Sequence, residues 1–117
     1  MATQSTVAVG ASAEAAATRL LIERGYAIVE RNFRCKAGEL DLIARDGGVL
    51  VFVEVRSRAD ADHGHAAETV DAHKQRQVAR VAEYYLAVRD VDYDEVRFDV
   101  VAITGGQAEL FQDAWRL

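Results

Sequence analysis

The stretch GELDLIARDGGVLVFVEVRSR, residues 38–58, predicts two adjacent strands joined by a tight turn. Polar and apolar residues alternate from Glu39 to Arg45, and β-branched residues dominate from Val49 to Arg58. The sequence Asp46-Gly47-Gly48 between them is typical of a β-hairpin. In the second strand four valines share one face, and the opposite face carries Leu50, Phe52, Glu54, Arg56 and Arg58. We expect the valine face to pack on a helix together with three residues of the first strand: Leu40, Leu42 and Ala44.

The register of this hairpin follows from its two faces. A two-residue turn at Gly47-Gly48 sets Asp41 opposite Glu54, and Glu39 opposite Arg56. A three-residue loop would mix the polar and apolar faces, so the hydrophobic pattern itself favours the shorter turn.

The predicted opposition of Asp41 and Glu54 has a chemical consequence. Directly opposed side chains have Cβ atoms about 4.5–5.5 Å apart. Two carboxylates at that separation repel each other unless a cation lies between them or one of them is protonated. Carboxylate oxygens are ligands that suit Mg²⁺ or Mn²⁺. The alternative is a solvated acidic pair neutralised by Arg56 and Arg58, but Glu54 interrupts the most hydrophobic strand of the chain, where a solvated face is less expected.

The rest of the chain predicts two helices and three further strands. A helix is expected over residues 12–24, with Ser12 as its N-cap and Gly25 at its C-terminal end. A second helix is expected from Val70 to Arg89. The remaining strands are expected over Tyr26–Phe33, Val96–Thr104 and Ala108–Trp115, with a turn at Lys36-Ala37-Gly38. The element order is therefore α-β-β-β-α-β-β, which predicts an α/β (α+β) fold with a mixed central sheet flanked by two helices.

The composition limits the kinds of function that the chain can have. Its 117 residues fit one domain, and 19 acidic against 14 basic residues give a net charge of −5. Proteins that bind nucleic acid through overall charge are usually basic, so such binding here would depend on a local patch and a metal. Cys35 is the only cysteine, which excludes an internal disulfide. No apolar run approaches the roughly 18 residues of a membrane span, and we expect a cytoplasmic protein with no membrane partner.

Several runs of the sequence resemble a known family. Residues 38–44, 51–58 and 97–102, with Gly25-Tyr26 and Arg31-Asn32-Phe33, are similar to the signature of the YraN-like family of uncharacterised bacterial proteins. That family resembles the restriction-endonuclease-like superfamily with its PD-(D/E)xK motif, and particularly the archaeal Holliday-junction resolvases. The resemblance implies a restriction-endonuclease-like core. We expect a single endonuclease-like domain over residues 11–117, preceded by a flexible N-terminal extension over residues 1–10.

The resemblance also implies roles for individual residues. Asp41 would be the first metal carboxylate and Glu54 the second, with Glu54-Val55-Arg56 standing for the (D/E)xK element. Glu14 on the first helix corresponds to an acidic residue that approaches the metal in the resolvases. The chain departs from the pattern because no proline precedes Asp41 and because the motif lysine is Arg56.

The arginine changes the expected chemistry. Lysine can hold or deprotonate an attacking water, whereas arginine stays charged and stabilises negative charge only. A metal would then have to lower the pKa of the attacking water. Lys74, near the start of the second helix, could supply a lysine from another element, or it could be a solvated helix residue.

These features favour a nucleic-acid-binding protein that is a divalent-metal-dependent endonuclease. We expect it to hydrolyse phosphodiester bonds with Mg²⁺ or Mn²⁺, on DNA more than on RNA, and on branched or structured substrates. The residues expected to contact phosphate are Arg34, Lys36, Arg58, Lys74, Arg76 and Arg80. The alternative is a non-catalytic nucleic-acid-binding module with the same fold.

The sequence is also compatible with a protein-interaction domain and with a second metal site. A protein-interaction domain would need an exposed apolar patch, which the sequence alone does not locate, and a homodimer is compatible with the sequence. The polar loop after residue 58 could bind a metal but is more typical of a solvated segment; its candidate ligands are Asp60, Asp62, His63 and His65.

Overall fold

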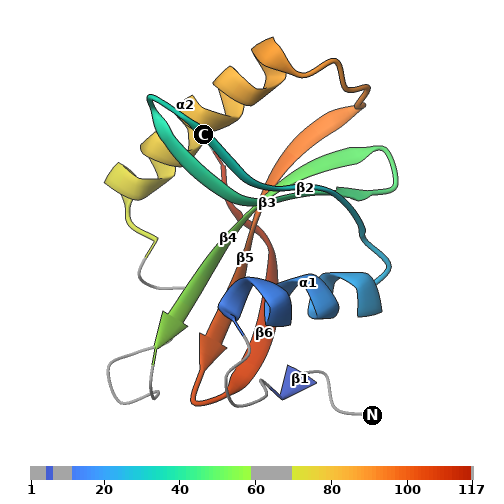
Figure 1. Ribbon diagram of the computed structural model, residues 1–117, viewed down its shortest axis with the longest axis vertical. Helices are drawn as coiled ribbons and strands as arrows, with labels where there is room; N and C mark the ends of the chain where they lie inside the picture. The colour runs from blue at the N-terminus through green and yellow to red at the C-terminus, as the bar shows by residue number, and fades with distance from the viewer. Residues whose placement is uncertain (1–4, 7–11, 59–69, 117) are drawn as a thin grey trace.

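Six strands form one mixed sheet in the order β1-β6-β5-β4-β3-β2 (Figure 1). The structure is a computed structural model in which residues 5–6, 12–58 and 70–116 are described. The elements are β1 (Ser5–Thr6), α1 (Ala13–Glu23), β2 (Ala27–Cys35), β3 (Gly38–Asp46), β4 (Val49–Arg58), α2 (Ala72–Val88), β5 (Glu95–Thr104) and β6 (Gln107–Trp115). From α1 onward this order confirms the predicted α-β-β-β-α-β-β arrangement.

The strand pairings make the sheet mixed. β4 and β5 are parallel, and the other neighbouring strands are antiparallel. Parallel neighbours need a crossover connection, and α2 lies in the connection between β4 and β5. The short β1 pairs with the start of β6, and its residues Ser5–Thr6 fall inside the segment 1–10 that was expected to be an extension.

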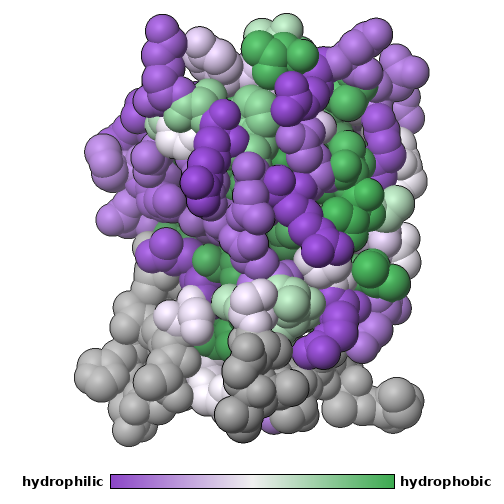
Figure 2. Space-filling view, viewed as in Figure 1, coloured by the Kyte–Doolittle hydropathy of each residue, from purple (hydrophilic) through white to green (hydrophobic). Residues whose placement is uncertain are grey.

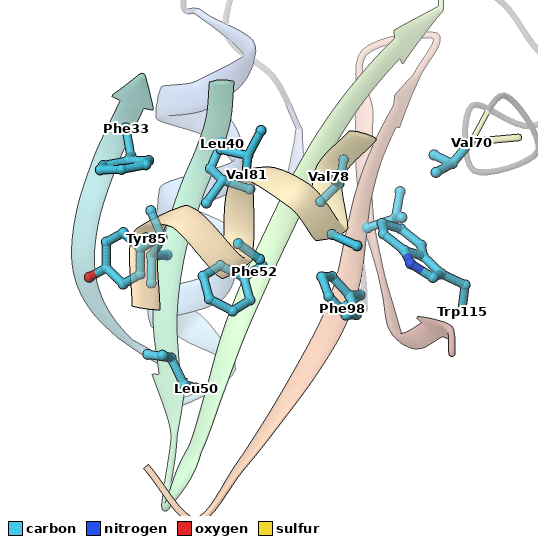
Figure 3. Packing of buried hydrophobic residues seen from close by; sticks show 14 residues of the cluster. Phe33, Leu40, Leu50, Phe52, Val70, Val78, Val81, Tyr85, Phe98 and Trp115 are labelled. Atoms are coloured by element: carbon cyan, nitrogen blue, oxygen red, sulfur yellow. The ribbon is translucent and has the colours of Figure 1, made fainter. Parts of the chain in front are cut away.

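The two helices cover opposite faces of the sheet (Figure 1). Four buried residues of α1, namely Ala16, Ala17, Leu20 and Leu21, pack with Val51 and Val53 of β4. On the other face α2 contributes Val78, Val81 and Tyr85, which pack with Leu50 and Phe52 (Figure 3). The predicted separation of the two faces of β4 is therefore confirmed, as is the expected sheet flanked by two helices. Among the described residues, no helix is long and apolar enough to cross a membrane.

The ends of the helices follow the predicted capping signals. The hydroxyl of Ser12 accepts a hydrogen bond from the Ala15 N–H at 3.0 Å, which is the N-cap contact of α1. Gly25 adopts a φ of 89°, which is the left-handed conformation expected after the helix. At α2 the carboxylate of Asp71 accepts from the Lys74 N–H at 2.9 Å.

The β3–β4 hairpin has the predicted two-residue turn. Asp46 pairs with Val49 across the turn, and Gly47 has a φ of 63°. The register continues through Ile43–Phe52 to Leu42–Val53, where the paired residues end. The expected pairings of Asp41 with Glu54 and of Glu39 with Arg56 lie beyond this point. Instead, the Asp41 carboxylate accepts a hydrogen bond from the Val55 N–H at 2.8 Å.

β3 changes face at Asp41, which corrects one prediction. Leu42 packs in the cluster under α1, as expected, but Leu40 packs in the cluster under α2. On the β2 side the pairs step from Arg31–Leu42 to Phe33–Leu40, and Asn32 between them has a φ of 54°. Strict alternation would keep Leu40 and Leu42 on one face. The alternation of β3 is broken between Leu40 and Leu42, opposite the left-handed Asn32, so the prediction for Leu40 was wrong.

A buried polar network joins the ends of several elements on the α1 face. Asp99 of β5 is fully buried and accepts hydrogen bonds from the Tyr26 hydroxyl at 2.6 Å and from Arg97 Nε at 2.9 Å. Arg97 also binds Asp46 at 3.0 Å. Burial and the bond to Asp99 raise the pKa of Tyr26 to about 12, so the hydroxyl keeps its proton. These contacts give Asp99 a structural role.

Candidate metal centre

Three carboxylates meet where β3 leaves its regular pairing. Glu14 lies in the first turn of α1, and Glu39 and Asp41 lie on β3. One carboxylate oxygen from each lies within 4.8 Å of the others. All three side chains are half-buried. Oxygen ligands at this spacing can surround one divalent cation, whose bonds to oxygen are about 2.0–2.6 Å long.

Local structure explains why these side chains converge. Capping by Ser12 starts α1 so that Glu14 falls in its first turn, at the end of the helix where negative charge is favoured. Asp41 lies just beyond the last β3–β4 pair, Leu42–Val53, and its carboxylate accepts a hydrogen bond from the Val55 N–H of β4. The centre is therefore built from a helix N-terminus and the part of β3 that lies beyond its pairing with β4.

Glu54 of β4 is not a member of that group, but it lies close enough to Asp41 for the charge of Asp41 to raise the pKa of Glu54. Its side chain is buried, with 4% of its surface exposed. Lys74 Nζ of α2 lies 3.3 Å from Glu54 Oε1, and Arg56 Nη1 lies 3.8 Å from the same oxygen. Glu54 therefore brings two cationic side chains, one from its own strand and one from α2, to the edge of the carboxylate cluster.

The electrostatics of the centre are unfavourable for two ionised carboxylates. Burial raises the pKa of Glu54 to about 7, and the charge of Asp41 adds to that rise, although Lys74 and Arg56 oppose it. Burial also raises the pKa of Asp41, with further contributions from Glu14 and Glu39, while the Val55 N–H lowers it. The effect of the Asp41 charge on Glu54 is the repulsion that the sequence predicted for this pair, and a bound cation would relieve it.

The structure brings most of the predicted site residues together. Asp41 and Glu14 lie in one cluster, with Glu54 and its partners Arg56 and Lys74 beside it. Lys74 reaches Glu54 from α2, as expected if another element supplies the lysine, rather than being a solvated helix residue.

Glu39 is a member that sequence reasoning missed. It was assigned to Arg56 across the hairpin, whereas in the structure it forms an ion pair with Arg34 at 2.5 Å. Its position two residues before Asp41 on one strand was the available signal.

Four of the predicted phosphate-contacting residues are exposed at the β2–β3 turn or on the helix that packs against it. Arg34 and Lys36 are exposed near the turn, and Arg76 and Arg80 are exposed one helical turn apart on α2. The helix lies directly on this turn, because a Cβ added at Gly38 would be 3.0 Å from Gln77 Nε2. The side chain of Arg58 lies outside the described residues, as do four loop candidates: Asp60, Asp62, His63 and His65.

Comparisons with known proteins place the chain in a family. It is 49% identical over 98 residues to a UPF0102 protein of Symbiobacterium thermophilum, a match that covers 84% of this chain and 83% of the relative. It is 39% identical over 108 residues to a UPF0102 protein of Persephonella marina, covering 92% and 93%. The family model matches residues 13–103, which include every carboxylate of the centre as well as Arg56 and Lys74. The family resemblance indicated by the sequence is thus confirmed, and the chain belongs to the uncharacterised protein family UPF0102.

Proposed function

We propose that this protein is a metal-dependent nuclease that hydrolyses phosphodiester bonds of nucleic acid, with DNA as the preferred substrate. One observation carries the proposal: three carboxylates of α1 and β3 converge, and the buried Glu54 of β4, which feels the charge of Asp41, is paired with Lys74 and Arg56. A set of acidic oxygens next to two cations matches the needs of phosphodiester cleavage, in which a metal binds on one side and negative charge develops on the other. We expect the protein to act in the cytoplasm.

The carboxylates fit Mg²⁺ or Mn²⁺. Asp41 is central to the donor set, because it belongs to the cluster with Glu14 and Glu39 and also interacts with Glu54. Bound at these oxygens, the cation would lower the pKa of the attacking water and neutralise charge on the phosphate. Mg²⁺ keeps several waters of its own, so a cluster of a few protein ligands is sufficient.

The two cations next to Glu54 have different capacities. Arg56 stays charged and is suited to stabilising the negative charge that builds on the phosphate oxygens. Lys74 can also hold a water or exchange a proton. Its ammonium group lies 3.3 Å from Glu54 and could replace the (D/E)xK lysine that β4 lacks. The site therefore contains both functions, distributed over β4 and α2.

Substrate binding would use the exposed basic residues around the β2–β3 turn. The residues that would contact phosphates are Arg34, Lys36, Arg76 and Arg80, with Arg58 as a further candidate. Contacts to phosphates do not distinguish one base sequence from another. Because the net charge of the chain is −5, binding should be weak, sensitive to salt and stronger with a divalent metal. Branched or structured DNA would present phosphates to the turn and to α2 together.

A non-catalytic nucleic-acid-binding module is the second candidate function. Arg56 at the place of the motif lysine favours it, because the strand then lacks a group that can deprotonate water. In that case the metal and the basic residues would bind the phosphate backbone without turnover.

Cleavage assays separate the two functions. Single-stranded, duplex and branched DNA, with RNA of matched length, would be incubated with Mg²⁺, with Mn²⁺ and with chelator. The nuclease proposal expects metal-dependent cleavage that Asp41→Asn abolishes and that the exposed control Asp92→Asn retains. Metal-dependent binding without cleavage of any substrate would favour the module. The absence of both binding and cleavage would reject both functions.

A further inference from the structure

A pocket separate from the candidate metal centre lies between α2, the start of β5 and the end of β6. It has a volume of about 420 Å³. Four residues of α2 line it at helical spacing: Ala79, Ala82, Glu83 and Leu86. Figure 3 shows Phe98 and Trp115 beside α2, on the side away from Phe33 and Leu40. The volume lies within the roughly 300–1,000 Å³ of pockets that accept a ligand or an anchoring side chain.

The floor of this pocket is apolar and aromatic. The rings of Phe98 and Trp115 stack with centroids 5.1 Å apart and an interplanar angle of 18°. Opposite them α2 presents two alanines, whose small side chains leave the space open. The indole N–H of Trp115 is buried and has no hydrogen-bond partner among the residues that are described. Buried indole groups usually find a partner, so this corner of the core is incompletely satisfied.

The rim of the pocket is acidic. Glu83 and Glu95 line it and are exposed, and within the described ranges neither makes an ion pair. Asp113 of β6 is a third acidic residue of the lining. The arginines at the pocket are already paired, Arg97 with Asp99 and Arg116 with Asp113. The local charge is therefore negative, which disfavours a nucleic-acid ligand here.

Exposed apolar side chains lie on the same helix and the loop that follows it. Tyr84 is 39% exposed, Val88 51% and Tyr93 45%. Figure 2 shows that the face of Figure 1 is mainly hydrophilic, with hydrophobic side chains gathered towards its top and right edges. The apolar pocket, with two glutamates exposed on its rim and unpaired within the described residues, is the part of this surface that is suited to bind a protein partner.

We propose that this pocket is a docking site for a partner protein, which inserts one large apolar side chain flanked by lysine or arginine residues. The apolar side chain would lie between Ala79 of α2 and the stacked rings, and the basic residues would pair with Glu83 and Glu95. Anchors of this kind account for most of the binding energy at many interfaces, and acidic rims select basic partners and speed their association.

Trp115 allows a direct test, because it is the only tryptophan of the chain and it lines the pocket. Two synthetic peptides without tryptophan, one of leucine and lysine and one of leucine and glutamate, would be titrated while Trp115 fluorescence is recorded. We expect a saturable change with the lysine peptide that weakens as salt rises, and none with the glutamate peptide. No change with the lysine peptide, or equal changes with both, would overturn the proposal.

Two variants locate the binding. Ala79→Leu fills the pocket and should lower the affinity for the lysine peptide at least tenfold. Ala87→Leu, at an exposed position of the same helix, should leave that affinity unchanged. Glu83→Lys at the exposed rim should weaken binding without touching the core, which keeps the test valid if Ala79→Leu misfolds.

Three further outcomes would reject the partner-protein assignment. Full affinity in Ala79→Leu would place the peptide elsewhere. Concentration-dependent self-association that Ala79→Leu removes would identify a second copy as the occupant, and a Trp115 response to DNA that Ala79→Leu removes would identify nucleic acid.

Discussion

Glu54 shows how a single buried carboxylate links the stability of the fold to its chemistry. Its side chain is almost fully buried, yet Lys74 and Arg56 hold one of its oxygens within ion-pair distance. These contacts do not fully offset burial and the charge of Asp41. The sequence predicted the repulsion between the two carboxylates from their opposition across the hairpin. It did not predict that a helix residue would approach them.

The pH dependence of stability should reveal this residue. The pKa of Glu54 rises from 4.5 to about 7 on folding, so without metal the folded state loses stability as pH increases through that interval. The loss is on the order of 3 kcal/mol and is complete above pH 7. Glu54→Gln removes the group that titrates. Denaturant melts at pH 5 and pH 8 with chelator should therefore show a larger drop for the wild type than for the variant; equal drops would mean that Glu54 is not perturbed.

Arg56 provides a test of the chemistry at the same scale. Arg56→Lys should keep the fold and leave nuclease activity unchanged or higher, because it restores the strand lysine. Arg56→Ala should abolish activity, since it removes the charge closest to Glu54 on β4. Steady-state cleavage rates of both variants, with melts to check the fold, are the measurement. An active alanine variant would show that Arg56 only balances the charge of Glu54.

At the scale of the element, the hairpin could be predicted and the break in β3 could not. Gly47 supplies the positive φ that a tight turn needs, and the two faces of β4 permit one register only. The break in alternation at Asp41 lies opposite Asn32 of the neighbouring strand, which adopts a left-handed conformation. Asparagine tolerates that conformation but does not require it, so the sequence contains no signal strong enough to predict the break.

Asn32 therefore offers a prediction about the element that positions Asp41. Asn32→Gly should leave stability nearly unchanged, because glycine adopts a φ of 54° freely. Asn32→Val should lower the free energy of unfolding by about 1–2 kcal/mol, because a β-branched residue is strained in this conformation. It should also weaken metal binding by shifting Asp41. Denaturant melts and Mn²⁺ titrations of both variants test this. A valine variant as stable as the glycine variant would show that the irregularity is not needed.

At the scale of the whole molecule, the candidate site depends on contacts distant in sequence. Glu14 could be placed only through the family resemblance, and Lys74 reaches Glu54 because α2 crosses the sheet next to β3. Local periodicity predicts each element but not the angle at which a helix lies on the sheet. The pocket beside Trp115 has the same origin, because α2 leaves the ends of β5 and β6 partly uncovered.

The central claim is that the carboxylates around Asp41 bind a divalent cation, and thermal melts of the wild type and Asp41→Asn test it most directly. In chelator the variant should be as stable as the wild type or more stable by about 0.2–1 kcal/mol, because it relieves like-charge repulsion. The asparagine oxygen can still accept from Val55. With millimolar Mn²⁺ the wild type should gain stability by mass action, and the variant should lose that gain. An equal destabilisation of the variant in both conditions, with no effect of Mn²⁺ on the wild type, would show that Asp41 is a structural residue and would contradict the metal centre.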